Sequence, residues 1–386
     1  MDSLVRYAMH PRIHAVLGGL LTLVTGMAPA WSAPVPASPT AHPLADGPPL
    51  VFVTRHQYRA DHHNTETMFQ TGEINTGKYQ PGGALKVIDF ARGGAVRTLV
   101  DPGPEGVVRD PDVSFDGTRV LFSMRKNIRD DYHLYEVNVT DGAVRQLTRA
   151  AGVFDIDPLY LPGGDLVFTS SREPKYCACN RHIMGNLFRM RGDGANIHQI
   201  GKSTLHEGHA SLLNDGRLLY DRWEYVDRNF GDAQALWVVN PDGTQHEIYW
   251  GANLSSPGGV IDARAVPGSP LAIAVWGACH DRPWGALALL DRRKGMNTRA
   301  SVVRTWPADA VNLLRENGVG HWDSTAGMKI KYEDPYPLDA ERFLAARMIE
   351  AGRERTGLYL VDVQGNETLL YEEPTLGCYD PVPLAP

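Results

Sequence analysis

The sequence lacks most of the short motifs that identify a chemistry. It contains no Gly-x-Ser-x-Gly nucleophile elbow, no complete phosphate-binding loop and no dinucleotide-binding fingerprint. It also contains no Cys-x-x-Cys-His, so a covalent c-type haem is not expected. The 45 acidic and 38 basic side chains give a formal net charge of -7, and this balance argues against nucleic acid as a partner.

Long apolar runs are scarce, and the longest one stands at the N-terminus. Arg6 and Arg12 precede an apolar stretch at 13–27, and small residues suitable for cleavage follow up to Ala33. This pattern predicts a signal peptide over residues 1–32. The next segment, 33–49, contains six prolines and predicts a stiff linker. No later run reaches the roughly 20 apolar residues of a membrane helix, so we expect a periplasmic or secreted monomer with no membrane span after signal removal.

The chain is rich in tight turns and short apolar runs at a regular spacing. One type of unit begins with Asp-Pro or an equivalent pair, continues through a glycine turn and ends in an apolar run; it occurs at 110–123, 157–170, 209–222, 262–276 and 334–348. A second type joins two short runs by a polar turn, at 84–99, 133–148, 186–200, 235–249, 286–295 and 358–371. Four short strands per roughly 50 residues are typical of a β-propeller.

The two chain ends complement each other. The first unit, at 51–55, lacks an opening strand, whereas Tyr379–Pro386 has the opening pattern and then stops. We therefore predict an all-β fold over residues 50–386: a six-bladed β-propeller of four-stranded antiparallel blades, closed by a C-terminal strand that joins the first blade. Segment 334–348 also shows helical spacing, but the repeat register favours two strands. An insertion at 305–333 is expected to hold a short helix.

This topology places the chemically versatile side chains on one face. In a four-stranded antiparallel blade, the loops between strands 2 and 3 and the connections between blades lie on the same face of the disc, which we call the loop face. All four cysteines and most histidines are expected there: His56, His62, His63, Glu66, Cys177, Cys179, His182, His206, His209, Cys279, His280, His321 and Cys378.

Two interpretations of the cysteines stay open. In an oxidising compartment, an even number of cysteines indicates disulfides, here between the 177–179 loop and Cys279 or Cys378. Alternatively, thiolates and imidazoles on neighbouring loops are ligands of zinc or another transition metal. The candidate metal ligands are Cys177, Cys179, His182, Cys279 and His280.

Three other groups are weaker candidates. His206-Glu207-Gly208-His209 resembles a fragment of a zinc-protease motif, but its histidines are three residues apart instead of four, which favours a structural role. The long loop 57–83 carries His62 and His63, which with His280 are candidate general bases. Trp223 and Tyr225, among the charged residues of 222–228, either stack on a ligand or belong to a loop closed by salt bridges.

These motifs resemble a known family. The units at 110–123 and 157–170 are similar to the WD-type repeats of TolB-like propellers. The segments YHLYEVN, LPGGDLVFTSSR, Cys179-Asn180-Arg181, LNDGRLLYDRWEYVDR, ALWVVNPDGT and DPYPL resemble, in this order, the middle propeller domain of hydrazine synthase alpha subunits. The resemblance implies a propeller whose Cys/His loops hold a metal or cofactor, with Cys179, His182 and His280 as the positions to test. The chain lacks the haem motif and the haem domain of hydrazine synthase.

Two functions follow from these observations. The first is an exported binding or scaffold protein that presents its Cys/His loop face to a small ligand, a metal or a protein partner. The second is a periplasmic metalloenzyme, a redox enzyme, hydrolase or lyase, with its site on the same face. The sequence favours the first function because no catalytic motif stands on its own, and it does not identify the ligand.

Overall fold

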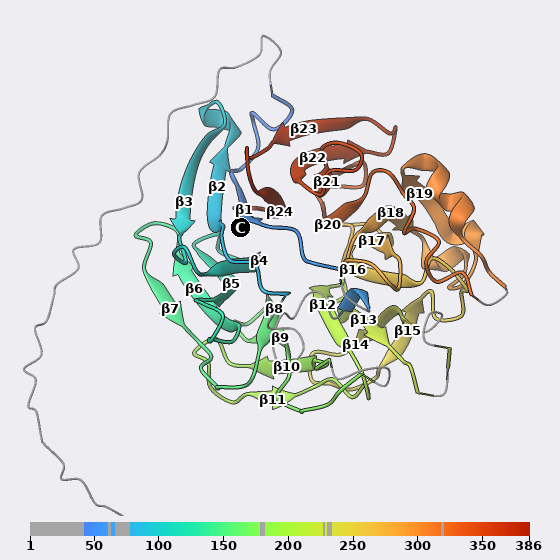
Figure 1. Cartoon of the computed structure of the whole chain (residues 1–386), viewed down its shortest axis with the longest axis horizontal. Helices are drawn as coiled ribbons and strands as arrows, with labels where there is room; N and C mark the ends of the chain where they lie inside the picture. The colour runs from blue at the N-terminus through green and yellow to red at the C-terminus, as the bar shows by residue number, and fades with distance from the viewer. Residues whose placement is uncertain are drawn as a thin grey trace, which may run out of the picture.

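The computed structural model describes residues 42–60, 63–65, 78–177, 182–226, 228–229, 234–317 and 320–386. The predicted signal peptide and most of the predicted linker lie outside this range. The described residues form short antiparallel strands, and Figure 1 shows their sheets arranged in a ring around a central axis. Over the same residues, no helix has the length and apolar character needed to cross a bilayer.

The two ends of the described chain share one sheet. Its strand order is β24 (Gly377–Pro383), β1 (Leu50–Arg55), β2 (Ala84–Asp89) and β3 (Ala95–Val100). Strands β24 and β1 are antiparallel, with Leu50 opposite Pro383 and Arg55 opposite Gly377. The predicted pairing of the C-terminal strand with the first unit is confirmed, and the strand begins at Gly377 instead of Tyr379. This pairing covers an edge of β1 that would otherwise expose its backbone N–H and C=O groups.

Three further sheets have four strands each, in the expected order along the chain. They are β4 (Val107–Val113), β5 (Arg119–Arg125), β6 (His133–Asn138) and β7 (Val144–Gln146); β8 (Asp155–Tyr160), β9 (Leu166–Ser170), β10 (Asn186–Met190) and β11 (His198–Gln199); and β12 (Glu207–Leu212), β13 (Leu218–Trp223), β14 (Gln234–Val239) and β15 (Glu247–Trp250). The predicted turn glycines Gly117, Gly164 and Gly216 join the first two strands of each sheet, with φ of 68°, 93° and 87°. These values require glycine or a similarly permissive residue.

The last sheet has eight strands. They are β16 (Gly259–Ala265), β17 (Ala272–Gly277), β18 (Gly285–Leu290), β19 (Val302–Trp306), β20 (Tyr332–Pro337), β21 (Arg342–Met348), β22 (Thr356–Asp362) and β23 (Glu367–Tyr371). A single residue pair, Gly285 with Tyr332, joins β18 to β20. We therefore describe this sheet as two groups of four strands and number all groups 1 to 6 along the chain, group 1 containing β24. The two strands expected at 334–348 are confirmed.

The insertion before β20 differs in its limits from the prediction. Strand β19 extends through Trp306 and β20 begins at Tyr332, so the connecting segment is 307–331 instead of 305–333. The expected short helix is a 3-10 helix, η6 (Ala308–Leu313), which ends where Leu314 adopts an extended conformation. Other 3-10 turns are η2 (Phe90–Arg92), η4 (Arg292–Lys294) and η5 (Arg299–Ser301).

Aromatic side chains fill the space between neighbouring groups. Trp250 of group 4 stacks on Trp276 of group 5, with ring centroids 5.9 Å apart. Trp306 of group 5 meets Phe343 of group 6 edge to face, at 5.5 Å. Because each sheet packs on the next one, the first strands β24, β4, β8, β12, β16 and β20 converge near the centre of the ring (Figure 1).

Candidate functional site

Each first strand carries one residue in the left-handed backbone conformation. These six residues, which we call the inner ring, have φ between 44° and 53°: Asp110, Asp157, His209, Asp262, Asp334 and Asp380. Each lies where the pairing with the next strand shifts its register, which marks a β-bulge. Among residues other than glycine, Asp, Asn and His enter this conformation most readily. The recurring aspartates are therefore the residues that the bulges favour.

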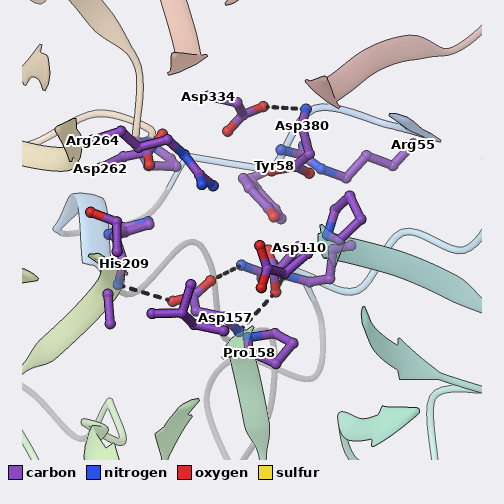
Figure 2. A pocket seen from close by; sticks show the side chains of 17 residues that line it. Arg55, Tyr58, Asp110, Asp157, Pro158, His209, Asp262, Arg264, Asp334 and Asp380 are labelled. Atoms are coloured by element: carbon purple, nitrogen blue, oxygen red, sulfur yellow. Dashed lines mark hydrogen bonds and ion pairs between the residues drawn. The ribbon is translucent and has the colours of Figure 1, made fainter. Parts of the chain in front are cut away.

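The bulges direct the inner ring into a cavity on the central axis. All six side chains line this cavity, together with Arg55, Tyr58, Arg109, Asp112 and Arg264 (Figure 2). The volume is about 50 Å³, which is enough for a few water molecules or an ion. The cavity is too small for a peptide or a sugar.

Part of the inner ring has a structural role. The backbone N–H of Asp157 donates to Oδ2 of Asp110 at 3.2 Å, and that of His209 donates to Oδ2 of Asp157 at 3.4 Å. Likewise, the N–H of Asp380 donates to Oδ2 of Asp334 at 3.0 Å. Each bond joins one group to the next, so these carboxylates connect neighbouring sheets at the centre.

The cavity carries more acidic than basic groups. Six aspartates line it, against three arginines and His209. Burial raises the pKa of Asp157 to about 6, and the neighbouring Asp110 adds to the shift. Burial and nearby carboxylates also raise the pKa values of Asp334 and Asp380 well above the usual range. The cavity therefore favours protons or a bound cation, because each would relieve the repulsion among these carboxylates.

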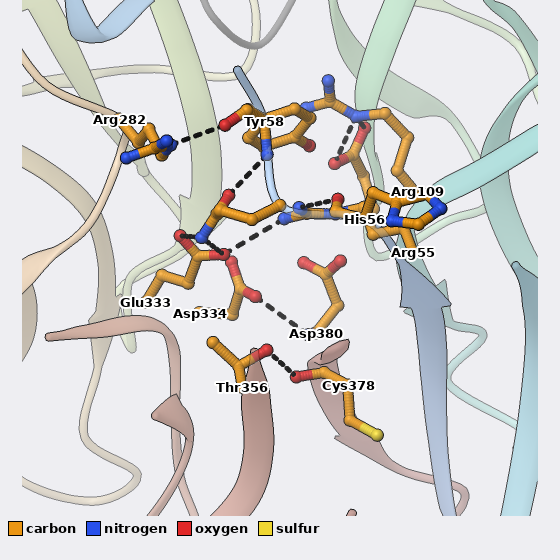
Figure 3. Close-up of polar contacts among 12 residues, drawn as sticks. Arg55, His56, Tyr58, Arg109, Arg282, Glu333, Asp334, Thr356, Cys378 and Asp380 are labelled. Carbon is orange, nitrogen blue, oxygen red and sulfur yellow. Dashed lines mark hydrogen bonds and ion pairs between the residues drawn. The ribbon is translucent and has the colours of Figure 1, made fainter. Parts of the chain in front are cut away.

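Two arginines hold Tyr58 at one end of the cavity. Their guanidinium carbons lie 3.9 Å (Arg55) and 5.2 Å (Arg109) from the centroid of the Tyr58 ring. Arg55 also contacts Glu333 at 3.2 Å, and Nε of Arg109 donates to Oδ2 of Asp110 at 2.7 Å (Figure 3). All of these side chains are buried except the partly buried Asp110. Tyr58 thus forms a rigid wall between the cavity and the loop face.

A groove lies on the other side of Tyr58. Its volume is about 380 Å³, and its walls come from the loops β1–β2, β17–β18, β21–β22 and β23–β24, all of them on the predicted loop face. The charged side chains that line it are Arg59, Arg282, Arg355 and Glu354, and the predicted candidate His56 lines it too. Arg282 is fixed by donating from Nε to the carbonyl of Tyr58 at 2.6 Å (Figure 3). Arg282 pairs with Glu354 at 2.7 Å, and Arg355 pairs at 2.9 Å with Glu372, which does not line the groove. The remaining positive charge, that of Arg59, favours an acidic group in this groove.

The structure brings several predicted loop-face residues together. The ring of His63 stacks on that of Trp223, and the N–H of Asn64 donates to the carbonyl of Cys279 at 2.9 Å. Cys177 shares a hydrophobic cluster with Trp223. Segment 63–65 thus reaches from group 1 to groups 4 and 5. Residues His62, Glu66 and Cys179 lie outside the described residues.

The other predicted residues are more dispersed. His182 is buried, and its carbonyl accepts a hydrogen bond from the N–H of Cys177 at 2.9 Å. Nδ1 of His280 pairs with Oδ2 of Asp323 at 2.8 Å, and His321 is exposed. Among the described residues, no cluster of three or more potential metal ligands includes Cys177, His182, Cys279 or His280.

The interpretation of Cys378 is corrected. It lies in strand β24 instead of a loop, packed with Leu50, Phe52 and Leu344 between groups 1 and 6. Burial, followed by the charge of Glu373, raises the pKa of its thiol to about 12. No disulfide joins any two of Cys177, Cys279 and Cys378. The predicted bridges from Cys177 to Cys279 or Cys378 are therefore wrong.

Trp223 and Tyr225 do not form the exposed aromatic surface that stacking on a ligand requires. Trp223 is fully buried, and its ring stacks on those of His63 and Tyr225, at centroid distances of 3.6 and 5.9 Å. Glu224 pairs with Arg222 at 3.2 Å and with Arg228 at 3.3 Å. For the described part of 222–228, the geometry favours the salt-bridged loop over direct stacking on a ligand.

His206 and His209 form a compact polar cluster with Asp221. Nδ1 of His209 lies 2.5 Å from Oδ1 of Asp221, and Nε2 of His206 lies 3.5 Å from Oδ2. Burial alone would lower the pKa of His209, but the carboxylates of Asp221 and Asp157 raise it to about 10. On a helix, two histidines reach one metal ion at a spacing of four residues, whereas here a bulged strand brings both imidazoles, three residues apart, to one carboxylate.

The inner ring itself was missed as a site. The Asp-Pro pairs at 110, 157, 334 and 380 were used only to find the repeats, and their recurrence in four of the six units was the available signal. Side chains of a regular strand alternate between its two faces, and this alternation does not reveal that a bulge turns these aspartates toward the central axis.

Comparisons with known proteins agree on the fold. No protein-family model matches the chain, and no curated protein matches it. Among solved structures, Kuenenia stuttgartiensis hydrazine synthase matches with a TM-score of 0.68 and 17% identity, over 88% of this chain and 47% of that one. TolB from Acinetobacter baumannii matches with a TM-score of 0.55 and 12% identity, over 86% of this chain and 66% of that one.

A putative TolB from Agrobacterium tumefaciens matches with a TM-score of 0.50 and 11% identity, over 86% of this chain and 91% of that one. The fold is therefore all-β and propeller-like, and the chain resembles TolB-like propellers and hydrazine synthase. It spans about half of the hydrazine synthase chain and 66% of the Acinetobacter TolB chain. At these identities the likeness concerns the fold alone.

Proposed function

We propose that the protein is an exported six-bladed β-propeller that binds a ligand or a protein partner on its loop face. In this proposal the six strand groups are the blades, the pairing of β24 with β1 closes the ring, and residues 1–32 direct export. The binding element is the groove above Tyr58, and the occupant carries an acidic group.

The groove is the observation that carries this proposal. Four separate loops contribute to it, and its charged lining is Arg59, Arg282, Arg355 and Glu354. Arg59 is exposed, whereas Arg282 is held between Glu354, at 2.7 Å, and the carbonyl of Tyr58. A fixed and an exposed guanidinium in one groove suit a carboxylate, which arginine binds through paired hydrogen bonds.

The experiment measures binding of citrate as a polycarboxylate probe. Citrate is expected to raise the melting temperature of the wild-type protein, because a ligand that binds only the folded state stabilises it. The Arg59→Gln variant should lose most of this shift. Arg353→Gln is the matched control, since Arg353 is an exposed arginine of the β21–β22 turn that does not line the groove. Equal shifts in all three proteins would contradict the proposal.

A second candidate is a periplasmic metalloenzyme. The observation that favours it is the cluster of His206, His209 and Asp221, whose potential ligand atoms lie within 4.8 Å of one another. Two imidazoles and a carboxylate are a common donor set of catalytic metals. Turnover by this enzyme would require a metal in the protein, so measurement of the metal content is the first test.

A further inference from the structure

We propose that His206, His209 and Asp221 bind a divalent metal ion of the zinc class beside the central cavity. This inference deepens the second candidate function, which rests on the same three residues. It does not depend on the ligand of the groove, because the groove and the cluster share no residue. It also differs from the cysteine-based metal site predicted on the loops.

The local fold gathers the three side chains at one point. His206 immediately precedes β12, His209 is the bulge residue of β12, and Asp221 lies in the adjacent strand β13. The strand register places Asp221 directly opposite Gly208, between the two histidines. One ligand atom from each residue lies within 4.8 Å of those of the other two.

Gly208 makes room for this arrangement. A Cβ atom at this position would lie 2.7 Å from Nε2 of His206, closer than real side chains approach. The imidazole of His206 therefore folds across the glycine toward Asp221. Gly208 has no positive φ that would explain the glycine by itself. The close approach of His206 is thus the reason for a glycine at this position.

The donor atoms suit a small divalent cation. Zinc binds imidazole nitrogen at about 2.0–2.1 Å and carboxylate oxygen at about 2.0–2.2 Å, so tetrahedral donors stand roughly 3.3 Å apart. The 3.5 Å between His206 Nε2 and Asp221 Oδ2 is close to this value. A small rotation of the Asp221 carboxylate, releasing its hydrogen bond to His209, would place the third donor. Oδ2 of the fully buried Asp221 lies 3.5 Å from Nε2 of His206, at the upper limit of a hydrogen bond.

Further carboxylates lie near the three candidate ligands, and the central cavity adjoins them. Oδ2 of Asp157 accepts the backbone N–H of His209, and Asp157, Asp262 and His209 all line the central cavity. These carboxylates would stabilise a divalent cation beside them. The cavity of about 50 Å³ offers space for a water molecule as a further ligand. The geometry therefore describes a site with three protein ligands and one side that faces the central cavity.

The test loads metal into the purified protein. After chelation and dialysis, Zn²⁺ is titrated calorimetrically and retained zinc is measured by mass spectrometry. Co²⁺ is then substituted for zinc, and its visible spectrum is recorded. We expect one metal per chain and a cobalt spectrum with d–d bands but no thiolate charge-transfer band. Loss of a residue that only hydrogen-bonds to a metal ligand weakens metal affinity by about 10–100-fold, so loss of a ligand should weaken it by more than about 100-fold.

The variants are His206→Ala and His209→Asn. Asparagine tolerates the left-handed conformation of position 209, so this change preserves the bulge. His198→Asn, an exposed histidine of β11, is the matched control, and circular dichroism checks the fold of each variant. Stoichiometric metal in wild type and control but not in folded His209→Asn supports the site. Failure of the wild type to retain either metal, or loss of metal in Cys177→Ser with full retention in His209→Asn, would overturn it.

Discussion

The imidazole of His63 stacks face to face on the indole of Trp223, with ring centroids 3.6 Å apart and ring planes 9° apart. His63 belongs to the loop after β1, whereas Trp223 ends β13 in group 4. The next residue, Asn64, donates from Nδ2 to Gln234 at 2.8 Å and to the carbonyl of Ala278 at 3.0 Å. Segment 63–65 is therefore fixed to two other groups and helps to close the loop face.

His63→Ala should loosen this connection. The variant loses an aromatic pair, which is worth about 0.5–1.5 kcal/mol beyond the buried area. We expect the free energy of unfolding in urea to fall by about 1 kcal/mol. His198→Ala, which removes an exposed histidine, serves as the control and should change the stability little. An unchanged stability in His63→Ala would show that the stacking has no energetic weight.

Removal of strand β24 should open the ring. A chain that ends at Leu376 lacks Cys378, Tyr379 and Val382, all of them buried, and exposes one edge of β1. We expect a loss of several kcal/mol, a large part of the roughly 5–15 kcal/mol that stabilises a domain. Thermal unfolding measures the effect. Deletion of residues 385–386 alone, which leaves β24 intact, is the control. A melting temperature equal to that of the full chain would contradict ring closure.

The sequence revealed the repeats because hairpin turns and apolar runs are local features. The turn glycine Gly117 and the C-terminal strand around Tyr379 could be placed for this reason. The direction of a side chain at a bulge depends on pairing with the next strand. The sequence therefore revealed the Asp-Pro pairs but not that their aspartates line the central cavity. The spacing of His206 and His209 does not fit a metal site on a helix, and the sequence did not show that a bulge brings the two residues together. The stacking of His63 on Trp223 depends on a contact between segments that are far apart in the sequence.

The buried carboxylate of Glu333 should make the protein less stable as the pH rises. It is 1% exposed, and burial raises its pKa to about 7 even though Arg55 and Gln57 contact it. In the unfolded chain the same carboxyl titrates near 4.3. Between about pH 5 and 7.5 the folded state therefore retains a proton that the unfolded state has lost, and the free energy of unfolding falls with rising pH.

The expected decrease from this group is about 1–3 kcal/mol. Urea unfolding at several values between pH 5 and 8 measures it. Glu333→Gln should reduce the dependence, because the amide keeps its contacts with Arg55 and Gln57 and does not titrate, whereas Asp157, whose pKa is raised to about 6, still contributes. Glu350→Gln, at an exposed turn, should leave the dependence unchanged. A wild-type stability that rises over this range would contradict the assignment.

Two variants of Asp334 should distinguish the structural role of the inner ring from its electrostatic role. Oδ2 of this residue accepts the backbone N–H of Asp380 at 3.0 Å, which links groups 6 and 1. Its φ is 53°, a conformation that asparagine tolerates and alanine does not. Burial and the neighbouring Glu333 raise the pKa of this carboxyl well above the usual range, so its surroundings disfavour the charged form. Asp334→Asn keeps the acceptor and the conformation and removes a charge that burial disfavours, so it should change the free energy of unfolding by less than about 1 kcal/mol. Asp334→Ala loses the acceptor and strains the bulge, which should cost about 2–4 kcal/mol. Urea unfolding of the two variants at pH 7 provides the comparison, and equal losses would mean that the bulge and its hydrogen bond do not hold the two groups together.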